Sequence, residues 1–194
     1  MLDGMVDDGS SRERIVRAAL GILGDEGVKR LTVRAVTERA GCSTTGIYTY
    51  FGGKQGLLDA LYSDGYEMLD HHTPEPVTDR PDEDIVEGLV KYRAFALEHP
   101  ALYLLMFASR AQGYLPSEEA ARRGEQSLRL FGNAVARAVE AGVLDADPSE
   151  AALHLWGAAH GFVMLELTGP GLGELSGETV LRRALRTMLD GYRA

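Results

Sequence analysis

Apolar residues recur along most of this chain at the three- and four-residue spacing that places them on one face of an α-helix. In the N-terminal quarter this spacing predicts a helix that Gly27 ends, followed by two short helices over 33–40 and 43–50. Longer helices are predicted over 54–69, 82–98, 101–108, 117–141, 148–168 and 178–192. The helix over 117–141 is expected to turn Leu128 and Val135 inward. The predicted fold class is therefore all-α.

The two short helices are joined by a tight turn. Thr32 is expected to cap the first helix and Gly41 to end it, while Ser43 caps the second. The second helix turns Ile47 and Phe51 inward. Its outward face is uncharged and rich in hydroxyl groups, from Thr44, Thr45, Tyr48 and Thr49. A supporting helix, a tight turn and a helix with such a face form the helix-turn-helix arrangement that enters a DNA major groove.

The same stretch carries a longer motif. Residues 41–54, GCSTTGIYTYFGGK, followed by Leu57 and Leu58, closely resemble the DNA-binding signature of TetR-type transcriptional repressors. Further along, Trp156, His160 and Gly161 resemble a C-terminal domain found in a subset of these repressors. The resemblance implies an N-terminal three-helix DNA-binding domain with a helix-turn-helix, plus a larger helical domain for ligand binding and dimerisation.

Chemistry and position assign roles to individual residues of the motif. Thr44 and Thr45 lie at the end of the helix that meets base edges, and Tyr48 can stack or donate to a phosphate. Lys54 opens the next helix, where free N–H groups favour a phosphate. The full predicted DNA-binding set is Thr32, Arg34, Ser43, Thr44, Thr45, Tyr48, Thr49, Tyr50 and Lys54. Ordinary polar surface residues are the alternative interpretation of each position.

The charge distribution supports a DNA partner, although the net charge of −9 does not. Residues 10–58 carry eight basic and four acidic side chains, a net charge of +4. Residues 59–194 carry 12 basic and 22 acidic side chains. Phosphates therefore attract the N-terminal part and repel the rest.

Composition and breaks divide the chain into four predicted segments. These are a flexible tail over 1–9, a helix-turn-helix DNA-binding domain over 10–53, a linking helix over 54–70, and a helical effector-binding and dimerisation domain over 71–194. The linking helix is expected to be the only direct lever between the two domains.

Aromatic and methionine residues of the larger domain suit a pocket for a small apolar or aromatic effector. They equally suit a filled core, and His160 can bond either a ligand or a backbone carbonyl. The predicted pocket set is Tyr92, Phe95, Tyr103, Met106, Phe107, Phe131, Trp156, His160 and Met164.

The last two predicted helices carry a candidate homodimer interface. Gly157 and Gly161 lie four residues apart, so they allow another helix to approach closely. Two such helices and their symmetry mates make a four-helix interface. The predicted interface residues are Gly157, Gly161, Leu181, Leu185 and Met188.

No enzyme signature is present, since the chain has neither a glycine-rich phosphate loop nor a nucleophile elbow. No cofactor and no metal site are expected, because the adjacent His71 and His72 have no third ligand nearby. Cys42 is the single cysteine, which fits a reducing cytoplasm, and the N-terminus has no apolar run typical of a signal peptide.

The sequence therefore predicts a sequence-specific DNA-binding transcriptional regulator. The resemblance implies a homodimeric repressor that a small effector releases from a near-palindromic operator. A constitutive DNA-binding regulator with no effector remains an alternative, and an enzyme that uses the helical cavity is a second one.

Overall fold

The structure of the chain is a computed structural model that describes residues 8–73, 78–169, 171 and 173–193, without the side chains of residues 8–10 and 112. Residues 1–7 of the flexible tail predicted over 1–9 lie outside the described part of the chain. A helix already begins at Asp8.

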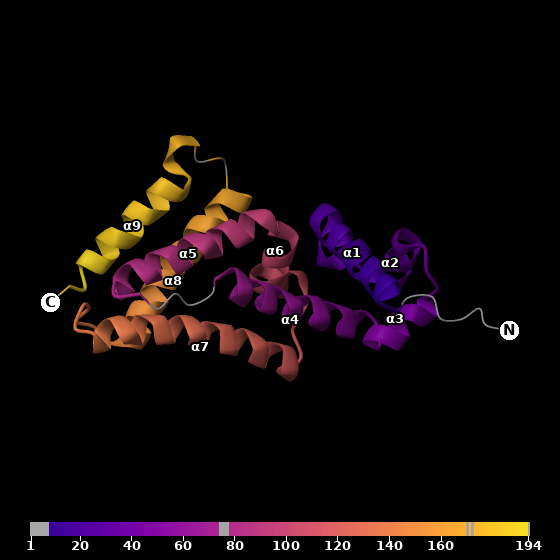
Figure 1. Cartoon of the computed structure of the whole chain (residues 1–194). Helices are drawn as coiled ribbons and strands as arrows, with labels where there is room; N and C mark the ends of the chain where they lie inside the picture. The colour runs from indigo at the N-terminus through magenta and orange to yellow at the C-terminus, as the bar shows by residue number, and fades with distance from the viewer. Residues whose placement is uncertain (1–7, 74–77, 170, 172, 194) are drawn as a thin grey trace. The chain divides into compact units, whose positions relative to one another are not determined.

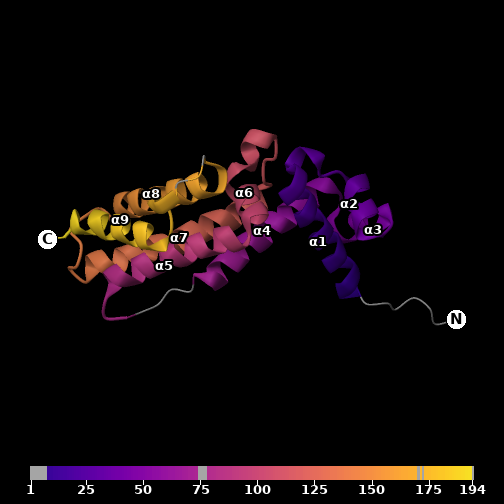
Figure 2. The ribbon, with the colours of Figure 1, turned by 90° about the horizontal axis from the view of Figure 1, so that it is seen from above.

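The described residues form α-helices and short 3₁₀ helices, and they contain no strand (Figures 1 and 2). In chain order the helices are α1 (Asp8–Glu26), η1 (Val28–Arg30), α2 (Val33–Ala40), α3 (Thr44–Phe51), α4 (Lys54–His72), α5 (Pro81–Glu98), α6 (Pro100–Ala108), η2 (Ser109–Gln112), α7 (Glu118–Glu140), α8 (Pro148–Thr168), η3 (Gly173–Leu175) and α9 (Glu178–Asp190). The predicted all-α class is confirmed.

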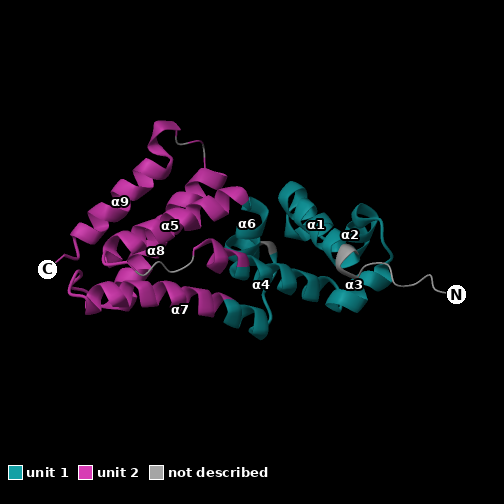
Figure 3. Ribbon diagram, viewed as in Figure 1, with its two compact units in different colours: residues 1–67, 99–123 teal, residues 68–98, 124–194 magenta. Residues whose placement is uncertain are grey.

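The chain divides into two compact units (Figure 3). Unit 1 comprises residues 1–67 and 99–123, and unit 2 comprises residues 68–98 and 124–194. Helix α6, η2 and the start of α7 thus group with the N-terminal helices. Because the chain passes from one unit to the other three times, α4 is not the only covalent connection between them.

Unit 1 is built around α1, which packs against α2, α3 and α6. Its core contains fully buried aliphatic side chains from α1, α3 and α4, among them Ile15, Ile47 and Leu57. An ion pair of 2.8 Å between Arg39 and Asp25 joins the ends of α2 and α1. Contacts with α1, rather than the intrinsic stability of so short a helix, therefore hold the supporting helix of the helix-turn-helix in place.

In unit 2, helix α5 packs against α8 and α9, and α8 also packs against α9. Ile85, Phe95, Leu155 and Leu185 are buried between these helices. Helix α8 begins where the sequence predicts, because the Asp147 carboxylate accepts the backbone N–H groups of the next turn at 2.9–3.0 Å.

A series of ion pairs fastens the C-terminal segment to α5. Arg182 pairs with Glu87, Arg186 pairs with Glu83 at 2.8 Å, and Arg193 pairs with Asp82 at 2.8 Å. As the residue number rises along the C-terminal segment, the number of the partner on α5 falls, so the two segments are antiparallel.

The inward position expected for Leu128 is wrong. Val135 of α7 is buried as predicted, but Leu128 is 49% exposed. Leu128 lies between the buried Ala120 and Val135, so the middle of α7 is less covered than the parts on either side of it. In the described part of the chain, no helix is both long enough and apolar enough to cross a membrane.

Candidate nucleic-acid interface

Helix α2 has the ends that the sequence predicts. The Thr32 hydroxyl accepts the backbone N–H of Ala35 at 3.1 Å, while Thr32 itself is extended. Gly41 follows the helix with φ 64° and ψ 39°, the left-handed conformation that favours glycine. These two residues set the length of the supporting helix and the direction in which the chain enters the turn.

Helix α3 presents one face to the core and the other to solvent. Ile47 is fully buried and Phe51 nearly so. The exposed residues are Ser43, Thr44, Thr45, Tyr48 and Thr49, and Tyr48 is 60% exposed. Ser43 occupies the cap position, but its hydroxyl makes no capping hydrogen bond. The outer face of α3 is therefore uncharged and carries a hydroxyl group at each of these positions.

Two glycines close the turn from α3 to α4. Gly52 has φ 69° and Gly53 has φ 125°, a region that other residues rarely adopt. Gly53 is buried, and a Cβ there would lie 3.5 Å from the Tyr48 ring. Lys54 then begins α4, and its Nζ donates to the Val28 carbonyl at 3.4 Å. Lys54 therefore follows Tyr48 closely in the sequence, separated from it by this turn.

Several basic side chains near α3 already have carboxylate partners. Arg34 lies 2.8 Å from Glu38, and this hydrogen bond, with the Glu38 charge, raises the pKa of Arg34. Arg12 lies 3.5 Å from Asp64 and stands over the Phe51 ring at 5.5 Å. Arg34 is on the surface, so it can exchange its exposed partner for a phosphate. The contact of Arg12 with Phe51 escaped the sequence analysis, because the two residues lie far apart in the chain.

Tyr50 is half-buried, with its ring edge-on to Phe51 at 6.3 Å. The structure thus places all nine predicted DNA-binding residues within unit 1, on α2 and α3, at the cap positions that precede these two helices, or at the start of α4.

Comparison with known proteins adds an independent finding. Residues 15–61 match the bacterial regulatory proteins of the tetR family. Residues 85–191 match the tetracyclin repressor-like C-terminal domain. The chain belongs to the TetR family. It is accordingly a DNA-binding transcriptional regulator of the TetR type, and the resemblance seen in the sequence is confirmed.

Individual proteins and solved structures are also similar to this chain. An uncharacterized HTH-type transcriptional regulator of Mycobacterium tuberculosis is 30% identical over 161 residues, which are 82% of this chain and 71% of the relative. A protein of unknown function from Rhodococcus sp. RHA1 has a TM-score of 0.83 and 25% identity, over 99% of this chain and 100% of that one. The structure of a SmeT–triclosan complex has a TM-score of 0.72 and 22% identity, over 95% and 92% of the two chains.

The residues predicted to line an effector pocket fall in both units. Tyr103, Met106 and Phe107 belong to unit 1, where the rings of Tyr103 and Phe107 are 4.8 Å apart. The other six, Tyr92, Phe95, Phe131, Trp156, His160 and Met164, belong to unit 2. Tyr92, Phe95 and Tyr103 are buried.

Within unit 2, α5 and α8 share a polar contact. The hydroxyl of Tyr92 lies 3.0 Å from Nδ1 of His160, and the Trp156 ring lies 5.4 Å from the His160 ring. Burial lowers the pKa of His160, so the imidazole is neutral at pH 7. A neutral ring can either donate to Tyr92 or accept from it.

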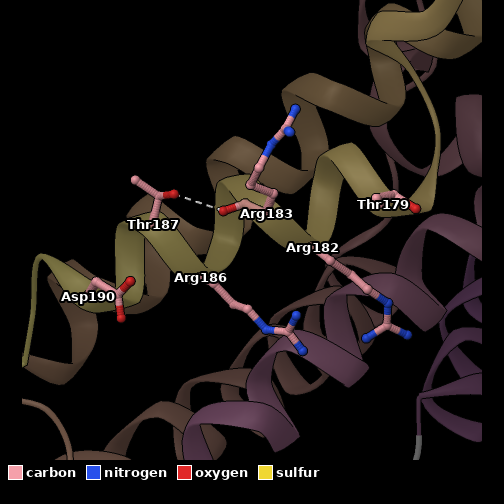
Figure 4. A pocket seen from close by; sticks show the side chains of 6 residues that line it. All are labelled: Thr179, Arg182, Arg183, Arg186, Thr187 and Asp190. Carbon is pink, nitrogen blue, oxygen red and sulfur yellow. Dashed lines mark hydrogen bonds between the residues drawn. The ribbon is translucent and has the colours of Figure 1, made fainter.

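A surface hollow of about 380 Å³ lies along α9 (Figure 4). Its lining residues are Thr179, Arg182, Arg183, Arg186, Thr187 and Asp190. Arg182 and Arg186 point one way, toward the carboxylates of α5, while Arg183 points away from them (Figure 4). None of the predicted effector-pocket residues lines this hollow.

The predicted dimer residues differ in accessibility. Gly157 is exposed and Gly161 is half-buried, and a Cβ on either would meet nothing within 4 Å. Leu181 and Leu185 are instead buried inside unit 2, and Met188 is half-buried. Leu153 and Leu165, which are not among the predicted interface residues, are 60% and 51% exposed on α8.

Proposed function

We propose that this TetR-type regulator is a repressor that binds a near-palindromic operator as a homodimer and is released by a small molecule. The observation that carries the DNA-binding part is the outer face of α3, on which Thr44, Thr45 and Tyr48 are exposed, with Lys54 at the start of the next helix. Threonine methyl groups suit thymine, its hydroxyl suits either kind of base edge, and lysine suits a phosphate.

Two-fold symmetry gives the operator its form. A dimer presents two copies of α3, which reach successive major-groove faces when they lie roughly 34–36 Å apart or a multiple of that. We propose that the α8 face containing Gly157, Gly161, Leu153 and Leu165 meets its copy in a partner subunit. Its support is the open space at both glycines and the exposure of both leucines. Leu181 and Leu185 would then back this face from within the subunit, and Met188 would lie at its border.

An effector of small apolar or aromatic character is the third part of the proposal. It is supported by the contact of Tyr92, His160 and Trp156 within unit 2, which combines aromatic rings with polar groups, and by a fold that accommodates triclosan in SmeT. Such a ligand acts by favouring one conformation, and a differential affinity of about 1–3 kcal/mol changes operator occupancy usefully.

A constitutive regulator without an effector is the second candidate. The observation that favours it is the burial of Tyr92, Phe95 and Tyr103, together with the hydrogen bond between Tyr92 and His160. A satisfied polar pair among buried rings is what a filled core contains. Under this alternative, no small molecule weakens operator binding.

The test is selection of bound duplexes from a random DNA pool, followed by titration in the presence of an aromatic compound library. We expect a motif with two inverted half-sites for the wild type and loss of enrichment for Tyr48→Ala. Enrichment without an inverted repeat would refute the dimer, and no enrichment at all would refute sequence-specific binding. Failure of every compound to weaken binding would favour the constitutive alternative.

A further inference from the structure

The loop that follows η2 is fastened to α4 by hydrogen bonds that converge on Asp59. Its Oδ1 accepts the hydroxyl of Tyr114 at 2.7 Å, the backbone N–H of Ser117 at 3.2 Å and the amide of Gln55 at 3.1 Å. The Gln55 amide also donates to the Leu115 carbonyl at 2.9 Å. All of these residues belong to unit 1 (Figure 3).

The bond from Tyr114 has the features of a fixed contact. Tyr114 is buried, while Asp59 is half-buried. Burial, the hydrogen bond to Asp59 and the Asp59 charge all raise the pKa of Tyr114, so its phenol stays protonated and remains a donor. A hydrogen bond to a carboxylate is among the stronger ones in proteins, and leaving either partner unpaired is costly.

Aromatic packing continues from this contact along α4. The Tyr114 ring lies 6.1 Å from Tyr62, which lies 5.1 Å from Tyr66, which in turn lies 5.8 Å from Phe107 of α6. At Gly65 a Cβ would lie only 2.7 Å from the Met106 sulfur, so α6 lies directly on α4. Helix α4, helix α6 and the loop after η2 therefore form one packed group within unit 1.

Asp59 also touches the start of α7. Ser117 immediately precedes α7, and its hydroxyl accepts the N–H of Ala120 at 3.3 Å, as a helix cap does. A carboxylate next to a helix N-terminus is favoured by the helix dipole. On α4, Asp59 lies only five residues after Lys54, where the turn from the recognition helix ends. One side chain therefore joins the beginning of α7 to the part of α4 that follows the turn from α3.

We infer that Asp59 and Tyr114 are positioning residues for DNA recognition: they fix the start of α4, and with it α3, to the beginning of α7. Neither residue touches DNA in this account. Because α7 is one continuous helix that starts in unit 1 and continues in unit 2, this contact offers a second route by which a change in unit 2 reaches α3. The regulatory half of this inference rests on the proposed effector control.

The test compares operator recognition in single and double variants. Tyr114→Phe removes one hydroxyl and keeps the ring, and Asp59→Asn removes the charge. The matched control is Tyr62→Phe, since the Tyr62 hydroxyl has no hydrogen-bond partner among the residues that the structure describes. The measured quantity is the ratio of affinities for the selected duplex and a scrambled duplex. A role confined to stability would lower the melting temperature and leave this ratio unchanged.

We expect Tyr114→Phe and Asp59→Asn each to lower the ratio about tenfold, with the double variant no worse than either single one. Tyr62→Phe should stay within about twofold of the wild type. If Tyr114→Phe fails to fold, the same affinity ratio is measured for Gln55→Ala. Gln55 is exposed, so its loss leaves the core intact. A folded Tyr114→Phe or Gln55→Ala with an unchanged ratio overturns the inference. Failure of the wild type to select any duplex refutes the proposed function instead.

Discussion

Replacing Glu166 by glutamine removes the charge from a buried ion pair that joins three helices. The Glu166 carboxylate on α8 accepts Nε and Nη2 of Arg93 on α5 at 2.7 and 2.8 Å. It also accepts the N–H of Gly177, which caps α9, at 2.9 Å. The side chains of Arg93 and Glu166 are only 15% and 8% exposed. Glutamine keeps the shape but turns an NH₂ group toward the guanidinium in place of one acceptor.

The expected cost follows from these contacts. Removing one partner of a buried pair typically costs about 3–5 kcal/mol, since the other charge remains without compensation. The partial exposure of Arg93 and the one acceptor that glutamine retains reduce this to about 2–4 kcal/mol. For a protein of this size, 1 kcal/mol corresponds to roughly 2–4 °C in melting temperature. We therefore expect a melting temperature about 5–15 °C lower in Glu166→Gln.

Calorimetry at several pH values gives a sharper assay than one melting curve. Burial raises the pKa of Glu166, but the hydrogen bonds from Arg93 and Gly177 outweigh it, so the net pKa lies below its ordinary value of 4.5. A lowered folded-state pKa stabilises the protein above pH 4.5, and this contribution is lost as the pH falls through the lower value. The difference between wild type and Glu166→Gln should thus be largest at neutral pH and shrink below pH 4.5.

The matched control is Glu38→Gln, which breaks the Arg34–Glu38 pair with exposures of 87% and 64%. An exposed pair of this kind contributes about 0–1 kcal/mol. Equal melting temperatures for wild type and Glu166→Gln, or equal effects of Glu38→Gln and Glu166→Gln, would refute the argument from burial.

Three further predictions test other parts of the molecule. In mobility-shift titrations, Tyr48→Ala should cost about 1–3 kcal/mol in operator affinity, and Lys54→Ala should flatten the log–log salt dependence by about one unit per subunit; unchanged binding in both would argue against the proposed docking. Gly157→Leu or Gly161→Leu should give monomers or aggregates in light scattering, whereas an intact dimer would exclude the α8 face. Asp147→Ala should lower the urea midpoint by the equivalent of about 0.5–2 kcal/mol, because two N–H groups of α8 lose their acceptor; an unaltered midpoint would show that the cap contributes nothing.

The local signals in the sequence predicted much of the secondary structure. Thr32, Gly41 and Asp147 mark helix ends through hydrogen bonds and dihedral angles that involve only neighbouring residues. The outward face of α3 was also predictable, because Ile47 and Phe51 identify the opposite, buried face. Local signals were therefore sufficient to predict both the fold class and the candidate recognition surface.

Contacts between distant residues could not be predicted in the same way. Asp59 and Tyr114 are 55 residues apart, and no spacing rule relates them. An apolar stripe shows that one face of a helix is covered, but it does not show what covers it. Leu185 was therefore predicted at the dimer interface, whereas it is buried inside its own unit. For the same reason the sequence assigned α6 to the larger domain, whereas the structure groups it with unit 1.

The central claim is that the exposed hydroxyl face of α3 contacts base edges. It is tested most directly by the affinity of the double variant Thr44→Ala/Thr45→Ala for the selected duplex and for a scrambled duplex at one salt concentration. The account predicts that affinity for the selected duplex falls by about fivefold or more, as the loss of base contacts worth about 1–3 kcal/mol requires, while affinity for the scrambled duplex is unchanged. An unchanged ratio of the two affinities, in a variant that remains folded and dimeric, would contradict it.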